Sequence, residues 1–291
     1  SGGAFSWSAR MDGRPSRTAM MTAMARGAHR LLDARPWILD DPFGMMLVGA
    51  SAREVFDARK GPYTPDMLSD IRAFIAARAR FAEDRLESGG FTQYVIVGAG
   101  LDSFVWRRPD LLKRMRVFEV DHPLTQAWKR ARAAEIGLWP PKDVVYAGCD
   151  FEREALGEAL TRAGFDWAAP SFFTWTGVTM YISVAASEAT LATVARCAAG
   201  SEIVFTYTPD PATLDERARF MSRAFATIAT AAGEPPVTSF TTPALEDLVR
   251  RAGLDLVAHP NADDLAALYF AQRPDALRPY GMERIAAARV R

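Results

Sequence analysis

The residues with the clearest chemical potential lie in the stretch QYVIVGAGLDSFVWR, residues 93–107, where an apolar run ends in two glycines. Glycine has no side chain, so a turn of this kind brings the backbone close to a bound ligand. In open α/β sheets, ligands lie at the carboxyl ends of the strands. We therefore expect Gly98, Ala99, Gly100 and Asp102 to contact a cofactor. The alternative is a glycine turn that only packs a strand against a helix.

The loop departs from the dinucleotide-binding fingerprint at Ser103. That fingerprint has a third glycine at this position, which allows tight helix packing and close approach of a pyrophosphate. S-adenosylmethionine carries no phosphate, so its site needs only the two open peptide units beside the methionine part. The loop therefore favours S-adenosylmethionine over a nicotinamide dinucleotide.

Acidic side chains follow the next two predicted strands. Glu119 and Asp121 end the stretch RVFEVD, about 20 residues after the glycines, where a carboxylate commonly accepts the ribose hydroxyls. Both point the same way in an alternating strand, and Asp121 lies nearer the ligand edge. Asp150 ends the following strand and can accept from an adenine amino group, with Phe151 against the ring. We assign all four to the cofactor site, with Asp121 preferred for the ribose.

If the bound cofactor is S-adenosylmethionine and donates its methyl group, the transfer is an in-line displacement, and the main task of the protein is positioning. A carboxylate acceptor needs no general base, whereas a phenol or alcohol does. His29, His122 and His259 are expected to be packed or surface histidines. Tyr181 is the candidate to contact the acceptor, with a core tyrosine as the alternative. The scarcity of bases favours a small-molecule carboxylate or acidic hydroxyl.

Arg78 lies near the centre of an apolar stripe on the predicted helix 66–86, whereas Arg80 faces nearly the opposite way. A buried guanidinium requires an anion. Two partners are open for Arg78, an internal acid in a structural ion pair or the carboxylate of the methionine part of the cofactor.

Several short apolar runs must position these residues. They are residues 93–97, 116–120, 143–147, 171–175, 202–207, 254–258 and 267–271. Helical segments separate most of them, at residues 123–136, 152–163, 185–199 and 243–252. Continuously apolar strands that alternate with helices indicate a mostly parallel, doubly wound α/β sheet.

The runs 254–258 and 267–271 are joined by a short polar link, so we expect an antiparallel pair at the sheet edge. A sheet of seven strands with an antiparallel last strand is typical of class I methyltransferases. Residues 1–90 read as an N-terminal helical cap, with helices at 16–32 and 66–86, and residues 91–291 as the core. A helical insertion is expected at 212–232.

The composition excludes several classes of protein. The 291-residue chain is 49% apolar, and no apolar run reaches the roughly 20 residues of a membrane helix. The 35 Lys and Arg balance the 35 Asp and Glu, which argues against a nucleic-acid partner. No secretory signal is apparent, so a cytoplasmic protein is predicted. Cys149 and Cys197 lack metal-ligand spacing and are expected in the core; no metal is predicted.

Several stretches together resemble the leucine carboxyl methyltransferase-like family, which includes many bacterial methyltransferases and some polyketide O-methyltransferases. They are SRTAMMTAMARGAHRLLDARPWILDDPF, AARARFAEDRL, QYVIVGAGLDSFVWR, VFEVDHP with WKR after it, CDF and TWTGVTMYIS, in family order. The resemblance implies a class I fold, a helical cap and S-adenosylmethionine as cofactor. It also implies that Gly98, Asp121, Asp150 and Phe151 line the cofactor site.

One departure concerns the stretch TWTG, where eukaryotic carboxyl methyltransferases resemble W-x-E-G. Thr176 stands in place of a carboxylate near the cofactor. We therefore do not assign to this chain the substrate of the eukaryotic enzymes, which is the terminal carboxylate of a phosphatase subunit. We predict an S-adenosylmethionine-dependent O-methyltransferase of a small molecule. A nicotinamide-dependent oxidoreductase and a non-catalytic S-adenosylmethionine-binding protein remain alternatives.

Overall fold

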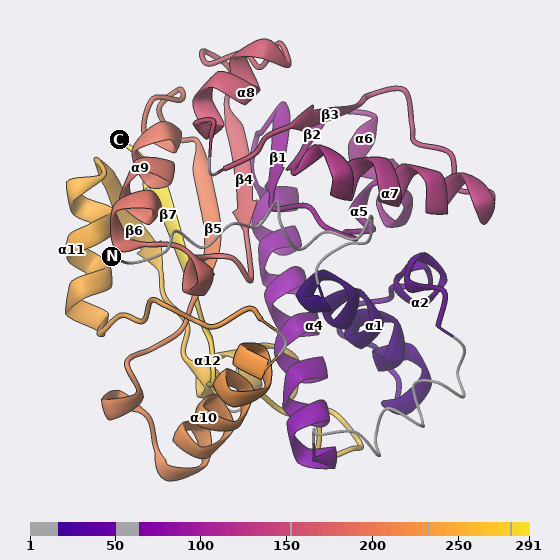
Figure 1. Ribbon diagram of the computed structural model, residues 1–291, viewed down its shortest axis with the longest axis vertical. Coiled ribbons are helices and arrows are strands. Elements are labelled where there is room, and N and C mark those ends of the chain that lie inside the picture. The colour runs from indigo at the N-terminus through magenta and orange to yellow at the C-terminus, as the bar shows by residue number, and fades with distance from the viewer. Residues whose placement is uncertain (1–16, 51–63, 152, 232, 280) are drawn as a thin grey trace.

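The computed structural model describes residues 17–50, 64–151, 153–231, 233–279 and 281–291, and its centre is a sheet of seven strands (Figure 1). The strands lie in the order β3-β2-β1-β4-β5-β7-β6. Their bounds are β1 Gln93–Val97, β2 Arg116–Asp121, β3 Val144–Gly148, β4 Ser171–Trp175, β5 Glu202–Tyr207, β6 Leu254–Ala258 and β7 Arg284–Val290. The pairs from β3 to β5 are parallel, and β7 is antiparallel to both neighbours. This confirms the predicted fold class.

Alternate residues of the central strands enter two separate cores, which is why these strands are continuously apolar. Val95 and Val97 of β1 pack into one core with α8 (Leu156–Arg162), α9 (Val184–Val194) and α11 (Thr242–Arg251). Tyr94 and Ile96 pack into the other. That core includes α4 (Pro65–Ser88), α5 (Phe104–Arg107), α6 (Pro109–Leu112) and α12 (Ala262–Tyr269). Two helical layers therefore fix the loops at the carboxyl edge of the sheet.

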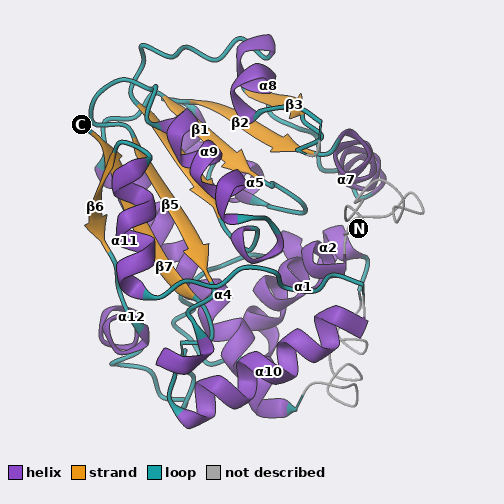
Figure 2. Cartoon of the chain, turned by 60° about the vertical axis from the view of Figure 1, so that its left-hand side comes forward, coloured by secondary structure: helices purple, strands orange, loops and turns teal. Residues whose placement is uncertain are grey.

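Among the described residues, the helices α1 (Arg17–Leu32), α2 (Phe43–Val48) and α4 precede β1. The start of α4 follows from local chemistry, because the Thr64 side chain accepts from the Met67 amide and proline occupies the first turn. The helix α10 (Glu216–Ala231) lies in the connection between β5 and β6. Figure 2 shows α1, α2 and α10 on the side of the molecule towards which β5 points.

The remaining helix, α7 (Pro123–Glu135), follows β2. The predicted helices at 66–86, 123–136, 152–163, 185–199 and 243–252 match α4, α7, α8, α9 and α11 to within five residues at each end. Predicted positions 16, 152 and 232 lie outside the described residues. No helix in the described ranges is both long and apolar enough to cross a membrane.

The prediction of a last strand at 267–271 is wrong. This run begins inside α12, which starts after Asn261 because the Asn261 side chain accepts from the amides of Asp263 and Asp264. The strand itself is β7, whose alanine-rich sequence lies buried between β5 and β6. A short apolar run is compatible with either a strand or one face of a helix, so the run 267–271 was ambiguous. The strand β7 was missed because alanine has a low strand propensity.

Candidate functional site

A cavity of about 380 Å³ opens at the carboxyl ends of β1, β2, β3 and β4, and residues of α1 and α4 form its opposite wall. All but one of the predicted site residues line it. They are Arg78, Gly98, Ala99, Gly100, Asp102, Asp121, Asp150, Phe151, Thr176 and Tyr181. The topology therefore gathers residues that lie up to a hundred positions apart in the chain.

The glycine turn requires its glycines for two reasons. Gly98 has a φ of 69° and Gly100 a φ of 48°, a left-handed conformation that residues with a side chain rarely adopt. In addition, a Cβ added at Gly98 would lie 2.8 Å from the Val178 Cγ2, and one at Gly100 would lie 3.2 Å from the Ala19 Cβ. The backbone thus approaches both α1 and the loop after β4 without side chains between them.

Asp121 is held rigidly at the tip of β2. One carboxylate oxygen accepts from the Gly100 amide at 2.6 Å and the other from the His122 amide at 2.7 Å. Burial raises the pKa of Asp121, while these two amides, the Lys129 charge and a hydrogen bond from the Thr125 side chain oppose that effect. Each carboxylate oxygen can accept more than one hydrogen bond, so Asp121 can also accept from a ligand.

Asp150 and Phe151 follow β3 at the same edge. The Asp150 carboxylate lies 4.0 Å from His122 Nε2 and 3.6 Å from Arg153 Nε. The Phe151 side chain is 44% exposed although it is a large aromatic group. An exposed ring beside a carboxylate at a cavity mouth suits a flat heterocycle with an amino group.

Glu119 does not line the cavity, contrary to the prediction. Its side chain is fully buried, and its Oε2 accepts from Lys129 Nζ of α7 at 2.7 Å. Burial raises the pKa of Glu119, and Lys129 opposes that effect. We expected the side chains of Glu119 and Asp121 to point the same way. Asp121, however, is the last residue of β2, and its carboxylate accepts from the Gly100 amide of the glycine loop. Glu119 is therefore a partner of α7.

Arg78 is buried on α4, as predicted, and adjoins both the cavity and an acid. Its Nη1 donates to Glu283 Oε2 at 3.2 Å, and its Nη2 would lie 3.3 Å from a Cβ at Gly177. Burial lowers the pKa of this guanidinium, while Glu283 opposes that effect. Arg80 is 49% exposed and pairs with Asp84 at 2.6 Å, which confirms its outward direction.

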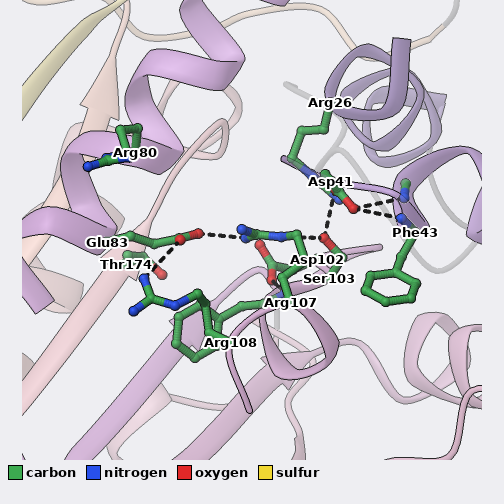
Figure 3. Close-up of polar contacts among 12 residues, drawn as sticks. Arg26, Asp41, Phe43, Arg80, Glu83, Asp102, Ser103, Arg107, Arg108 and Thr174 are labelled. Atoms are coloured by element: carbon green, nitrogen blue, oxygen red, sulfur yellow. Dashed lines mark hydrogen bonds and ion pairs between the residues drawn. The ribbon is translucent and has the colours of Figure 1, made fainter. Parts of the chain in front are cut away.

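A chain of buried polar side chains joins the N-terminal helices to the glycine loop (Figure 3). Asp41 accepts from Arg26 Nε at 2.8 Å and from Ser103 Oγ at 2.7 Å. Arg107 donates to the same Ser103 hydroxyl at 3.0 Å and to Glu83 of α4 at 2.6 Å. Ser103 is thus the central member of this chain, which gives a physical reason for a hydroxyl where a dinucleotide site has glycine.

Sequence reasoning missed several residues of the cavity wall. They include Thr18, Thr22, Arg26, Tyr94, Phe104 and Arg107. Arg26 and Arg107 could have been found by the signal that identified Arg78, which is an arginine among apolar residues of a helix. No local pattern predicted the pairing of Asp41 with Arg26 and Ser103, which lie 15 and 62 positions away. No cluster of three or more metal-ligating side chains occurs among the residues the structure describes.

The histidines occupy different environments. His29 is fully buried and bonds Asp33 at 2.8 Å, and His259 bonds the Tyr207 hydroxyl at 2.7 Å. His122 lines the cavity and caps α7, since its ring accepts from the Leu124 amide at 3.2 Å. The first two are structural, as expected.

The cavity fits S-adenosylmethionine by its own geometry. Gly98 and Gly100 line the cavity with backbone and no side chain, the Asp121 carboxylate offers an acceptor to a ribose, and Phe151 offers a ring face. Buried Arg78 offers a guanidinium to a carboxylate at the other end of the cavity.

Known proteins agree with this fit. The family model of leucine carboxyl methyltransferase matches residues 19–195. The chain is 29% identical over 296 residues to the putative S-adenosyl-L-methionine-dependent methyltransferase YktD of Bacillus subtilis, covering 91% of this chain and 94% of that protein. It is 34% identical over 206 residues to a putative S-adenosyl-L-methionine-dependent methyltransferase of Frankia alni, covering 68% and 66%.

Solved structures give the same fold. A DUF574 family protein from Streptomyces avermitilis superposes with a TM-score of 0.61 at 16% identity, covering 95% of this chain and 98% of that one. A putative methyltransferase from Thermobifida fusca superposes with a TM-score of 0.59 at 17% identity, covering 97% of each. The chain belongs to the leucine carboxyl methyltransferase family and is an S-adenosylmethionine-dependent methyltransferase.

Proposed function

We propose that this methyltransferase acts on an oxygen of a small molecule, either a carboxylate or an acidic hydroxyl. The observation that carries the proposal is the set of groups at the Arg78 end of the cavity. This end offers the hydroxyls of Thr18, Thr22 and Tyr181 together with the Arg78 guanidinium. The histidine of the described cavity wall, His122, lies at the other end beside Asp150. Such groups orient an oxygen acceptor and suit one that needs no strong base.

The cofactor is proposed to lie across the ends of β1, β2 and β3. Asp121 would accept the ribose hydroxyls, Asp150 the adenine amino group, and Phe151 would cover the ring. Gly98, Ala99, Gly100, Asp102 and Thr176 would line the rest of the cofactor. Arg78 would take the methionine carboxylate while keeping its bond to Glu283.

The bound cofactor supplies a methyl group on a sulfonium, whose leaving group is neutral. The protein therefore has to hold the acceptor oxygen in line with that methyl group and exclude water. The Tyr181 hydroxyl is proposed to position the acceptor by donating a hydrogen bond. An ionised carboxylate needs no proton removal, because its oxygen becomes the ester oxygen directly.

The N-terminal helices are proposed to act as a cap, comprising residues 1–90, over a methyltransferase core of residues 91–291. Support comes from the residues of α1 and α4 that form the cavity wall opposite the strands. The two alternatives raised by the sequence, a nicotinamide-dependent oxidoreductase and a non-catalytic binding protein, are wrong in view of the family.

The test is turnover of S-adenosylmethionine with matched panels of carboxylic acids, phenols, amines and thiols, followed by alkaline treatment of the products. Methyl esters release methanol in mild base, whereas methyl ethers do not. Transfer to either panel supports the proposal and identifies the class of oxygen. Transfer to amines or thiols alone would contradict it.

A further inference from the structure

A second cavity of about 30 Å³ adjoins the first at its Arg78 end. The two cavities share the wall residues Thr18, Thr22, Ile75, Arg78, Gly177 and Tyr181. The small cavity therefore lies beside the groups that we propose to position the acceptor and away from Asp121 and Phe151. It is a side pocket of the active site rather than part of the adenosine site.

Flexible apolar side chains form most of the side pocket. Met21 comes from α1, Phe74 from α4, Met180 from the 3-10 turn Thr179–Tyr181, Phe225 from α10, and Met282 from the segment before β7. Thioether side chains adapt to irregular apolar groups, and aromatic rings give them broad surfaces. Five different parts of the chain thus converge on one small apolar space.

Two acids restrict the charge of an occupant. Asp70 is 1% exposed and lines the side pocket, as does Glu283, which holds Arg78 at 3.2 Å. A carboxylate of the occupant would be repelled by these two acids. An uncharged group is therefore favoured. The volume corresponds to about two water-sized groups, which is the size of a short alkyl group.

We propose that the side pocket binds a short uncharged alkyl group of the acceptor and thereby selects acceptors by chain length. The inference rests on the proposed function, since the acceptor oxygen would lie at Tyr181 while its alkyl part enters between α1, α4 and α10. Met282 lines the pocket together with Met180 and Phe225, so shortening its side chain should enlarge the pocket.

The decisive variant is Met282→Ala, with Met221→Ala as its matched control. Both methionines are buried, with exposures of 9% and 3%, and both belong to one cluster between α4 and α10. Only Met282 of these two lines the side pocket. Loss of either side chain should lower the thermal stability by similar amounts, so a difference in acceptor preference reports on the pocket.

The probes are straight-chain carboxylic acids and para-alkylphenols of increasing alkyl length. Binding to the S-adenosylhomocysteine complex is measured by calorimetry, and kcat/KM by turnover. Met282→Ala is expected to move the preferred length by two or three methylenes, with affinity for the longer probes rising about fourfold for each methylene newly buried. Met221→Ala is expected to keep the wild-type preference.

The outcomes separate this inference from the proposed function. Binding that depends on length and shifts in Met282→Ala, but without turnover, supports the side pocket and contradicts the oxygen acceptor. Turnover without dependence on alkyl length, or with the same preference in all three proteins, overturns the side pocket and leaves the proposed function standing. Absence of both binding and turnover overturns both.

Discussion

Replacement of Asp41 by Asn removes one charged oxygen from a fully buried site. Its Oδ1 accepts from the amides of Phe43 at 2.9 Å and Gly44 at 3.0 Å, and its Oδ2 from Arg26 and Ser103. In Asp41→Asn, the amide NH2 must face two donors whichever way the side chain is turned. The conflict therefore cannot be relieved by rotation.

The size of the effect follows from these contacts. A hydrogen bond to a charged group contributes about 1.5–3 kcal/mol. Loss of one partner of a buried ion pair costs about 3–5 kcal/mol, because the other charge stays buried. We therefore expect Asp41→Asn to lower the free energy of unfolding by about 3–5 kcal/mol.

The assay is urea unfolding at neutral pH, with Asp40→Asn as the control. Asp40 is adjacent in sequence, but its side chain is 59% exposed and pairs with the partly exposed Arg30 at 2.6 Å. Such a surface pair contributes less than about 1 kcal/mol. Equal midpoints and slopes for the two variants would refute the reasoning, since they would mean that the buried network adds no more than a surface pair.

The pH dependence has a defined sign. Burial alone would raise the pKa of Asp41, but Arg26, Arg107 and the Ser103 hydroxyl lower it more, to below its ordinary value of 3.8. A group with a lowered folded-state pKa stabilises the protein above the unfolded-state value and loses that effect as the pH falls through the folded-state value. The difference in stability between wild type and Asp41→Asn should shrink as the pH is lowered through about 4 and below.

Three further predictions concern the cavity and the core. Asp121→Ala should weaken S-adenosylhomocysteine binding at least about tenfold in calorimetry, because two charge-assisted hydrogen bonds are lost; unchanged affinity would remove Asp121 from the ribose site. Arg78→Met should weaken that binding by about 2–4 kcal/mol and Arg80→Met by under about 1 kcal/mol; an Arg78→Met protein that melts lower yet keeps the full ligand-induced shift would make Arg78 purely structural. Burial raises the pKa of both Cys149 and Cys197 to about 12, so neither thiol should react with a thiol reagent at pH 8 until the protein unfolds; fast labelling of the folded protein would contradict this.

The sheet was predictable because its signals are local. The runs at 93–97, 171–175, 202–207 and 254–258 are strands with those bounds. The first three are buried along their whole length, so they read as continuous apolar runs, whereas β6 at the sheet edge alternates between buried or half-buried and exposed residues. The strand β7 was missed because burial between two strands and two helical layers comes from tertiary context, and its alanines carry little strand preference.

The site residues likewise include some that local sequence signals predict and others that depend on tertiary contacts. The glycine turn and Asp121 follow strands directly, so topology brings them to one edge. Glu119 was wrongly assigned to the cofactor site because the alternation of side chains along a strand does not specify which residue packs against each side chain. In the structure, Lys129 of α7 donates a hydrogen bond to Glu119. Likewise, the network from Asp41 to Ser103 joins residues 62 positions apart, a distance over which no sequence spacing is informative.

The place of β7 in the sheet has a consequence for assembly. This strand follows β6 in the chain but lies between β5 and β6, so it must insert between two strands that are made before it. Glu283, the partner of Arg78, directly precedes β7, and Met282 lines the side pocket. Insertion of β7 therefore also brings Glu283 to Arg78 and Met282 to the side pocket, whereas the proposed adenosine end lies at the ends of β1, β2 and β3. A folding intermediate without β7 would retain the elements of the proposed adenosine end but would lack the Glu283 partner of Arg78 and the Met282 wall of the side pocket.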